Sequence, residues 1–433
     1  MPALVNAHDH ARPLSSNSFG AAFTPLESWL PRTIFATPPD PYLAALAPLA
    51  RAARSGCGAV MVHYTRPSGT MPIVEEARAI AKAAADVGVR IAFAPAVKDM
   101  NPLVYGDETE VLDALPEATR ALFRETFVRP PTSPESYLAL VDELAEAISG
   151  PFVDVQYGPA GPQWCSPALL EAIAEASART GRRVHMHLLE TERQRLWADS
   201  AHPDGIAPFL DGLGLLSERL TLAHCVCARP DELDLIAASG ARIVTNFSSN
   251  MHLRSGLGPI AEAHRRGVRV AVGVDGAALD EDDDILREMR LVHGVHAGSG
   301  LYANWTPAEF LALAVASGRA AVGAPGDGAL APGRPADFCV LDLDALDRDA
   351  VMPVDPLDLL FARATASHLR ELVVAGRSVV SDGKLTSVDL DGAEAELRAR
   401  FRQDVGRYAE LDRGWPCFDA ALRHWFQGCA GCG

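Results

Sequence analysis

The feature that most constrains the fold is a regular alternation of short apolar runs with amphipathic stretches along the first two-thirds of the chain. Eight runs rich in β-branched residues are separated by stretches rich in Ala, Glu, Arg and Leu, a pattern typical of parallel strands joined by helices. The predicted strands cover residues 3–8, 59–64, 90–95, 152–157, 183–187, 220–224, 242–246 and 268–275. Eight such units predict an α/β fold closed into a (β/α)8 TIM barrel, in which active sites form at the carboxyl ends of the strands.

Proline and glycine positions indicate where helices begin and end, and a change in composition late in the chain indicates that further parts follow the barrel. Proline lies near several predicted helix starts and glycine after several ends, and the helices are expected over 73–87, 134–148, 167–180 and 230–238. A linker rich in glycine and proline is followed by a predicted strand, a hairpin and a helix, over 336–342, 371–384 and 392 to about 408. We therefore expect three parts: a barrel over 1–325, a small β-sandwich-like segment over 326–390 and a C-terminal helical tail over 391–433.

Composition narrows the possible partners and the location. The 433 residues carry a net charge of −17 without clustered basic residues, which argues against a nucleic-acid partner. There is no apolar run of about 18 residues to cross a membrane and no basic start of a signal peptide, so we expect a cytoplasmic protein. The eight cysteines are scattered and are expected to be thiols. Cys429 and Cys432 have C-x-x-C spacing but lack the strand–helix setting of a redox motif.

Polar residues fall where the predicted strands end. Histidine, asparagine or aspartate ends six of the strands, at His8, His63, His187, His224, Asn246 and Asp275. His8 and His10 lie two residues apart, so strand alternation turns both imidazoles to the same side. Together with His187 and Asp275 they form a set of three histidines and a carboxylate, which suits zinc, iron or a similar divalent metal with a position left open for water.

The motifs around these residues resemble those of the metal-dependent amidohydrolase superfamily, and within it the branch of triazine hydrolases and heterocycle deaminases such as guanine and cytosine deaminases. The resemblance rests on Val5–His10, Met186–Thr191, Leu222–Val226, Asn246–Asn250 with Leu253, Ser255 and Gly256, Val272–Gly276, and Gly328–Asp337. These motifs span nearly the whole chain in the same order and spacing.

The resemblance also implies roles for individual residues. One divalent metal, most often zinc in this branch, would be bound by His8, His10, His187 and Asp275. His224 would contact the water on the metal or the substrate, Glu190 would act as proton shuttle, and Asp275 would accept a proton from the water. Binuclear members bridge two metals with a modified lysine of the fourth strand, and residues 152–157 contain no lysine, so one metal is expected.

These residue types suit the replacement of an amino group on a ring by water. A bound metal lowers the pKa of its water towards about 7 and so provides hydroxide at neutral pH. Ammonia leaves readily only after protonation, and Glu190 lies three residues after His187, close enough to deliver protons to the same substrate. His224 can donate a hydrogen bond to developing charge. We therefore expect a metal-dependent aminohydrolase that deaminates a nitrogen heterocycle of purine, pterin, pyrimidine or triazine type.

Two other functions stay open. Hydrolysis of another C–N, C–Cl or cyclic amide bond could occur at the same metal with a different pocket, and release of ammonia would separate the two reactions. A metal-free barrel could instead serve as a non-catalytic subunit, but every expected ligand is present, as are Glu190 and His224.

Several further residues have both a functional and a structural interpretation. Substrate contact is considered for five residues near strand ends, namely His63, Tyr64, Gln163, Trp164 and Asn246; for Trp164, packing in a long loop is favoured. His185 is expected to be a packed, hydrogen-bonded core histidine. The acidic run Asp280 to Asp284 is expected to be a solvated helix start rather than a cation site.

The beginning of the chain departs from the family pattern. Relatives usually carry several tens of residues before the first barrel strand, which form half of the small β-sandwich, whereas this chain begins at that strand. We expect either a start further upstream or a reduced sandwich. In the second case the hairpin over 372–380 would expose an apolar edge, and covering that edge with a second copy predicts a homodimer.

Overall fold

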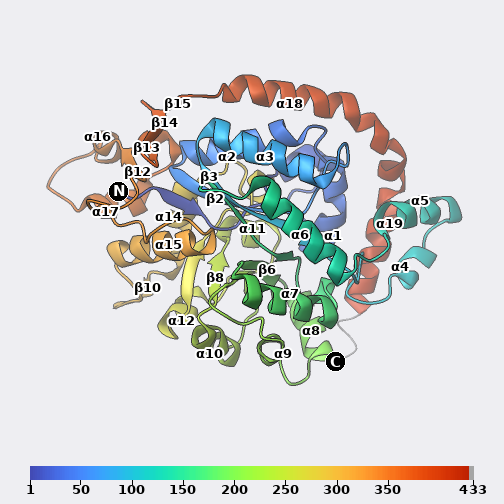
Figure 1. Cartoon of the computed structure of the whole chain (residues 1–433). Coiled ribbons are helices and arrows are strands. Elements are labelled where there is room, and N and C mark those ends of the chain that lie inside the picture. Colours follow the sequence, from blue (N-terminus) through green and yellow to red (C-terminus); the bar gives the residue numbers. More distant parts are fainter. Residues whose placement is uncertain (429–433) are drawn as a thin grey trace.

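The computed structural model describes residues 1–428 and contains a closed barrel of parallel strands surrounded by helices (Figure 1). The barrel strands are β1 (Leu4–Asn6), β2 (Cys57–Tyr64), β3 (Arg90–Val97), β4 (Val153–Val155), β5 (Gly158–Pro159), β6 (Val184–Leu188), β7 (Leu220–His224), β8 (Arg242–Thr245) and β9 (Arg269–Val272). The predicted fourth strand is interrupted, because β4 and β5 pair with successive parts of β3. The predicted TIM barrel is therefore confirmed, with one strand in two pieces.

Backbone hydrogen bonds close two groups of parallel strands into one barrel. The groups have the orders β1-β2-β3-β4 and β6-β7-β8-β9. At one junction the amide of Tyr157 donates to the carbonyl oxygen of Arg183 at 2.9 Å. At the other junction the amide of Ala7 donates to the carbonyl oxygen of Val272 at 3.0 Å. Nearly all barrel-strand residues are buried, as expected for parallel strands covered by helices.

The outer layer contains the four helices that periodicity predicts, with bounds that agree within one residue. They are α3 (Ile73–Val87), α6 (Pro134–Ile148), α7 (Pro167–Thr180) and α10 (Pro230–Ser239). In α7 the side chain of Ser166 accepts from the amide of Leu169, proline occupies the first turn, and Gly181 ends the helix with a φ of 75°.

The other helices of the barrel and its loops were not assigned from the sequence. They are α1 (Leu26–Arg32), α2 (Pro41–Arg54), α4 (Thr109–Asp113), α5 (Glu117–Phe127), α8 (Glu192–Ala201), α9 (Ile206–Gly212), α11 (Phe247–His252), α12 (Ile260–Arg265), α13 (Ala277–Asp280), α14 (Ile285–His296) and α15 (Pro307–Ala321). Over residues 1–428, no helix is both long and apolar enough to span a membrane.

A four-stranded antiparallel sheet lies beside the amino terminus of the chain (Figure 1). Its strands, in order, are β12 (Phe338–Leu341), β13 (Leu369–Val374), β14 (Arg377–Ser381) and β15 (Lys384–Leu385), and the short helices α16 (Leu343–Leu346) and α17 (Pro356–Arg363) lie between the first two. The first residues of the chain add to the free side of β12, where the amide of Cys339 donates to the carbonyl oxygen of Met1 at 3.0 Å.

The expectation of an exposed apolar edge over 372–380 is wrong. β13 lies between β12 and β14, β14 also pairs with β15, and Leu372 and Val380 are fully buried. The edges of the sheet are formed instead by the two-residue strand β15 and by residues 1–3. Both are too short to pair with a strand of another chain. The exposed edge therefore no longer supports a homodimer, and the homodimer stays a prediction.

The predicted C-terminal helical tail contains two helices, and the sequence predicted the bounds of the first only. α18 (Leu390–Asp404) runs alongside α2, and α19 (Ala409–Gly428) continues to the opposite side of the barrel, where it packs against α1, α4 and α5 (Figure 1). The contacts of α19 form an apolar cluster separate from the barrel core, with Phe123, Trp415 and Phe418 among its buried members. Cys429 and Cys432 lie outside the described residues.

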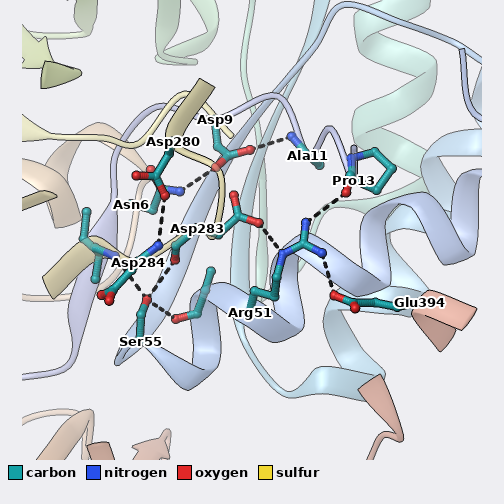
Figure 2. A network of polar contacts seen from close by, with 12 residues as sticks. Asn6, Asp9, Ala11, Pro13, Arg51, Ser55, Asp280, Asp283, Asp284 and Glu394 are labelled. Atoms are coloured by element: carbon teal, nitrogen blue, oxygen red, sulfur yellow. Dashed lines mark hydrogen bonds and ion pairs between the residues drawn. The ribbon is translucent and has the colours of Figure 1, made fainter. Parts of the chain in front are cut away.

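The acidic run Asp280 to Asp284 is largely buried, contrary to the expectation of a solvated helix start (Figure 2). Asp284 does begin α14, because its side chain accepts from the amides of Leu286 and Arg287. Asp283, however, accepts from the Arg51 guanidinium at 2.8 Å, and Arg51 also donates to Glu394 of α18 at 2.8 Å. The run is buried because donors distant in sequence compensate its charge; only Glu281 and Asp282 are exposed.

Candidate metal centre and active site

Four predicted metal ligands converge at the carboxyl ends of β1, β6 and β9. The Nε2 atoms of His8 and His10 lie 3.3 Å and 3.0 Å from Oδ1 of Asp275. The ring centroid of His187 lies 4.9 Å from that of His8. All four side chains are buried. Residues separated by most of the barrel sequence therefore come together at the end of the barrel where active sites form.

The rings of these histidines are held from behind through Nδ1. Nδ1 of His10 lies 2.7 Å from the carbonyl oxygen of His63, and Nδ1 of His187 lies 2.7 Å from that of Ala160. Nδ1 of His8 lies 2.7 Å from Nε2 of His185. A carbonyl oxygen only accepts, so it fixes the tautomer with hydrogen on Nδ1 and leaves the Nε2 lone pair free to bind a metal.

The unpartnered atoms of the centre fit a divalent cation. Among the described residues, Nε2 of His8 and His224 and Oδ1 of Asp275 are buried without a hydrogen-bond partner. Burial lowers the pKa of His8 to about 3 and lowers that of His187 well below its usual value, so both imidazoles are neutral. Burial opposes ionisation of Asp275, but His8 and His10 hold its pKa well below its ordinary value. Neutral imidazoles beside an ionised carboxylate are the donor set of a zinc-type site.

A close backbone approach beside Asp275 depends on a glycine. Gly273 follows β9 where this strand meets the end of β1, and a Cβ atom there would lie 2.6 Å from Oδ1 of Asn246 and 2.7 Å from the backbone nitrogen of His8. Asp275 then adopts a φ of 64° while its amide donates to the carbonyl oxygen of His8 at 2.9 Å. Ser249 donates to Oδ2 of Asp275 at 2.6 Å. These contacts fix the carboxylate with Oδ1 toward the histidines.

Glu190 and His224 lie on the other side of Asp275. Oε1 of Glu190 and Oδ2 of Asp275 are each 3.8 Å from Nε2 of His224. Burial raises the pKa of Glu190 to about 7, although His224 opposes this shift. A carboxyl group with such a pKa can both donate and accept a proton near neutral pH.

Two amide side chains lie within hydrogen-bond distance of Nδ1 of His224. Nδ1 of His224 lies 3.0 Å from Oδ1 of Asn250 and 3.3 Å from Nδ2 of Asn246. Asn250 can accept a hydrogen from Nδ1, whereas Asn246 can donate one to it, so either tautomer finds a partner. His224 can therefore present either a lone pair or a hydrogen from Nε2 to the centre.

A cavity of about 570 Å³ opens over these groups. Its floor includes His10, His187, Glu190, His224 and Asp275. Its walls are rich in aromatic side chains, which are Trp29, Tyr105, Phe127, Trp164 and Phe426. A flat apolar ring fits between such walls.

Of the five residues considered for substrate contact, the cavity is lined by Trp164 alone. The Tyr64 hydroxyl donates instead to Glu76 at 2.6 Å, and His63 is fully buried beneath the metal centre. Gln163 and Asn246 are also buried outside the lining, and Asn246 contacts His224. His185 is buried and hydrogen bonded to His8, as expected.

Sequence reasoning missed several cavity residues. Arg12 follows His10 by two positions and could have been noticed from that spacing. Glu27, which accepts from Thr191 at 2.6 Å, and Phe426, which belongs to α19, carry no recognisable signal because loops and the tail bring them to the site.

Comparison with known proteins gives consistent results for sequence and fold. The model of the Amidohydrolase family matches residues 1–385. A 5-methylthioadenosine/S-adenosylhomocysteine deaminase of Desulfovibrio desulfuricans is 31% identical over 418 residues, which cover 95% of this chain and 86% of the relative. A 5'-deoxyadenosine deaminase of Methanopyrus kandleri is 27% identical and covers 90% of this chain and 83% of its own length.

Solved structures share the same fold. An adenosine deaminase from Xanthomonas campestris with bound zinc has a TM-score of 0.76 at 24% identity, over 94% of this chain and 86% of the other. A triazine hydrolase from Arthrobacter aurescens has a TM-score of 0.78 at 23% identity, over 93% of this chain and 87% of the other. The family match over residues 1–385 and the relative that is 31% identical over 86% of its length show that the chain belongs to the amidohydrolase family.

Proposed function

We propose that this protein is a metal-dependent aminohydrolase that removes the amino group of a nitrogen heterocycle as ammonia. The observation that carries the proposal is the convergence of unpartnered imidazole and carboxylate atoms beside Glu190, a buried acid, at the floor of an aromatic-walled cavity. The membership of the amidohydrolase family and the deaminase relatives support it.

In this proposal His8, His10, His187 and Asp275 hold one divalent metal. When bound, the metal would supply an activated water. Zinc is favoured, because three imidazoles and one carboxylate suit its borderline character, and iron is the second choice. A single ion is favoured because β4 lacks a lysine that could bridge two.

Three side chains divide the proton transfers. Asp275 would accept a proton from the attacking water. Glu190 donates its proton to the ring nitrogen, and the proton held by Asp275 passes to the leaving amine. As ammonia leaves, Glu190 regains a proton from the hydroxyl group that the attack has added to the ring, and a pKa of about 7 suits both transfers. His224 donates a hydrogen bond from Nε2 to the tetrahedral centre, with Nδ1 then accepting from Asn246.

The proposed substrate class is a planar heterocycle with an exocyclic amino group. Trp29, Tyr105 and Trp164 offer aromatic surface on the walls, which favours stacking with such a ring. The relatives named for 5-methylthioadenosine, S-adenosylhomocysteine and 5'-deoxyadenosine make adenine-type rings the first to test. The protein is proposed to act in the cytoplasm, where such small molecules occur.

The experiment is an ammonia-release screen with the zinc-loaded protein on purines, pterins, pyrimidines and triazines, paired with a Glu190→Gln variant. Glu190→Gln should retain its metal and lose about 10²–10⁴-fold in kcat, because it removes proton transfer but no ligand. The matched control is Glu192→Gln, an exposed glutamate in the first turn of α8, which should keep normal turnover.

Two results would contradict this assignment. Release of chloride or another leaving group, without ammonia, would move the protein to another hydrolase class. Loss of metal from Glu190→Gln would mean that Glu190 is a ligand rather than an acid.

A further inference from the structure

Within residues 1–428, four cations line the cavity without an ion-pair partner: Arg12, Arg66, Lys98 and the exposed Arg129. Arg12, Arg66 and Lys98 all belong to its lining, and none of them forms an ion pair within residues 1–428. The Arg12 guanidinium donates to Oγ1 of Thr65 at 2.8 Å and Arg66 donates to Oγ1 of Thr33, both neutral acceptors. Lys98 donates only to the carbonyl oxygen of Pro102, at 3.3 Å, and is exposed at the open side of the cavity.

Among residues 1–428, three of the four buried arginines pair with carboxylates, whereas Arg242 donates to the carbonyl oxygen of Glu218. Arg90 and Arg319 donate to Oδ2 of Asp337 at 2.9 Å and 2.8 Å, and Arg195 donates to Glu232 at 2.7 Å. A chain with a net charge of −17 has ample carboxylates for such pairs. Because a cation shielded from water is stabilised by a counter-charge, an anionic group on a bound molecule would supply the partner that the half-buried Arg12 and Arg66 lack.

Arg12 carries an additional unused donor. Its Nε atom is buried without a hydrogen-bond partner, while the guanidinium carbon lies 5.0 Å from the ring centroid of Trp29. Stacking on Trp29 holds the planar group in place. Burial, together with the charge of the neighbouring Arg12, lowers the pKa of Arg66 to about 10.

The carboxylates of the cavity are engaged elsewhere. Asp275 and Glu190 belong to the metal centre, and Glu27 accepts hydrogen bonds from Thr191 at 2.6 Å and from Tyr105 at 3.3 Å. None of the three is within ion-pair distance of a cavity arginine. The positive charge on this side of the cavity is therefore available to a bound molecule.

We propose that Arg12, Arg66 and Lys98 form a subsite for an anionic group, a carboxylate or a phosphate, carried by the heterocyclic substrate. Two guanidinium groups offer paired N–H donors that match the oxygen geometry of either anion, and Lys98 adds a point charge at the entrance. The assignment of the anion to the substrate rests on the proposed function. Ring and anion bind the same cavity, the ring over Glu190 and His224 and the anion beside Arg12.

The test uses two pairs of ring compounds that differ by one anionic group and need no turnover. Calorimetric titration of the zinc-loaded protein compares inosine 5′-monophosphate with inosine, and orotate with uracil. In at least one pair the anionic member should bind about tenfold more tightly or better, with a preference that weakens as salt is added. The pair that shows the preference distinguishes phosphate from carboxylate.

Substitutions test whether the cavity cations cause the preference for the anionic compound. Arg66→Met should reduce it to about threefold or less, and Arg66→Lys should retain part of it because the charge remains. The matched control is Arg413→Met, which removes an exposed arginine of α19 outside the cavity lining. If Arg66→Met does not fold, Lys98→Met serves in its place, since Lys98 is exposed.

The anion subsite is overturned if the native protein shows no preference in either pair, or if Arg66→Met and Arg413→Met behave alike. Either result, together with ammonia release from uncharged heterocycles, leaves the proposed function intact. Preference for the anionic compounds without ammonia release from any heterocycle has the opposite meaning: the subsite stands and the deaminase proposal fails.

Discussion

Replacing Phe418 with alanine should release the C-terminal helix α19 from the cavity and leave the barrel folded. Phe418 is fully buried, with ring centroids 4.5 Å from Phe123 and 5.6 Å from Phe127. These rings belong to an apolar cluster that is separate from the barrel core. Loss of the Phe418 ring should therefore weaken the docking of α19 rather than the barrel itself.

The size of the effect follows from the burial of the ring. Truncation of a buried phenylalanine to alanine costs about 3–5 kcal/mol. Because 1.4 kcal/mol corresponds to a factor of ten, the population with α19 undocked should rise by a factor of about 10² to 4 × 10³. Phe426 lies on the same helix and lines the cavity, so undocking removes part of the wall. We expect a higher KM with unchanged metal content.

Hydrogen exchange and steady-state kinetics test this together. Amides of α19 should exchange much faster in Phe418→Ala, whereas amides of β6 and β7 should be unaffected. Val405→Ala is the control, because Val405 is also an apolar residue of the C-terminal tail but its side chain is 59% exposed. Equal acceleration of exchange in α19 and in the barrel strands would refute the separation of the two clusters, and an unchanged KM despite rapid exchange would refute a role of α19 in the cavity wall.

Two further predictions concern the metal centre. The kcat of ammonia release should fall as pH rises through the pKa of Glu190, which burial raises to about 7. Below this pH Glu190 carries the proton that it donates, and above it the proton is lost. A pH profile of the metal-loaded protein measures this, and a flat profile from pH 6 to 9 would argue against Glu190 as the acid. Removal of the metal by a chelator should abolish activity and lower the melting temperature, because an ion that binds only the folded state contributes about 4 kcal/mol at a thousand times its dissociation constant. One equivalent of zinc per chain should restore both, as followed by elemental analysis and calorimetry; a requirement for two equivalents would contradict the single-ion proposal.

The parts of the fold that the sequence predicted are those controlled by local periodicity. The helices α3, α6 and α7 have their predicted bounds because amphipathic spacing, proline at or near the start and glycine near the end agree within each segment. The bounds of α19, within the predicted helical tail, could not be assigned because Gly414 and Pro416 lower its intrinsic helix propensity, and tertiary contacts of Trp415 and Phe418 compensate for that. Tertiary packing of this kind leaves little trace in local sequence.

In the candidate site, too, local sequence patterns could be predicted and tertiary contacts could not. His8, His10 and Asp275 could be found because strand ends in a barrel meet at one rim. Their supporting contacts could not, since the partners of His10 and His187 are backbone carbonyl oxygens, which any residue type can provide. The acidic run was misjudged for a related reason: Arg51, which compensates Asp283, lies 232 positions away in the chain.

Backbone strain at the strand ends connects the fold to the chemistry. Several non-glycine residues in the left-handed region lie at or beside the centre, namely Ala11, Leu189, His224, Cys225 and Asp275, with φ between 49° and 73°. Each such conformation costs on the order of 1–3 kcal/mol and persists only where the surroundings enforce it. Here the neighbouring strands do so: the amide of Asp275 donates to the carbonyl oxygen of His8 at 2.9 Å and that of Cys225 to Leu188 at 3.0 Å. In an extended strand, successive side chains point alternately to the barrel core and to the outer helices. A left-handed residue at the end of the strand breaks this alternation, so Nε2 of His224 and Oδ1 of Asp275 point at the centre. The closed barrel therefore contributes more than a scaffold, because its inter-strand hydrogen bonds hold the strained turns on which the geometry of the centre depends.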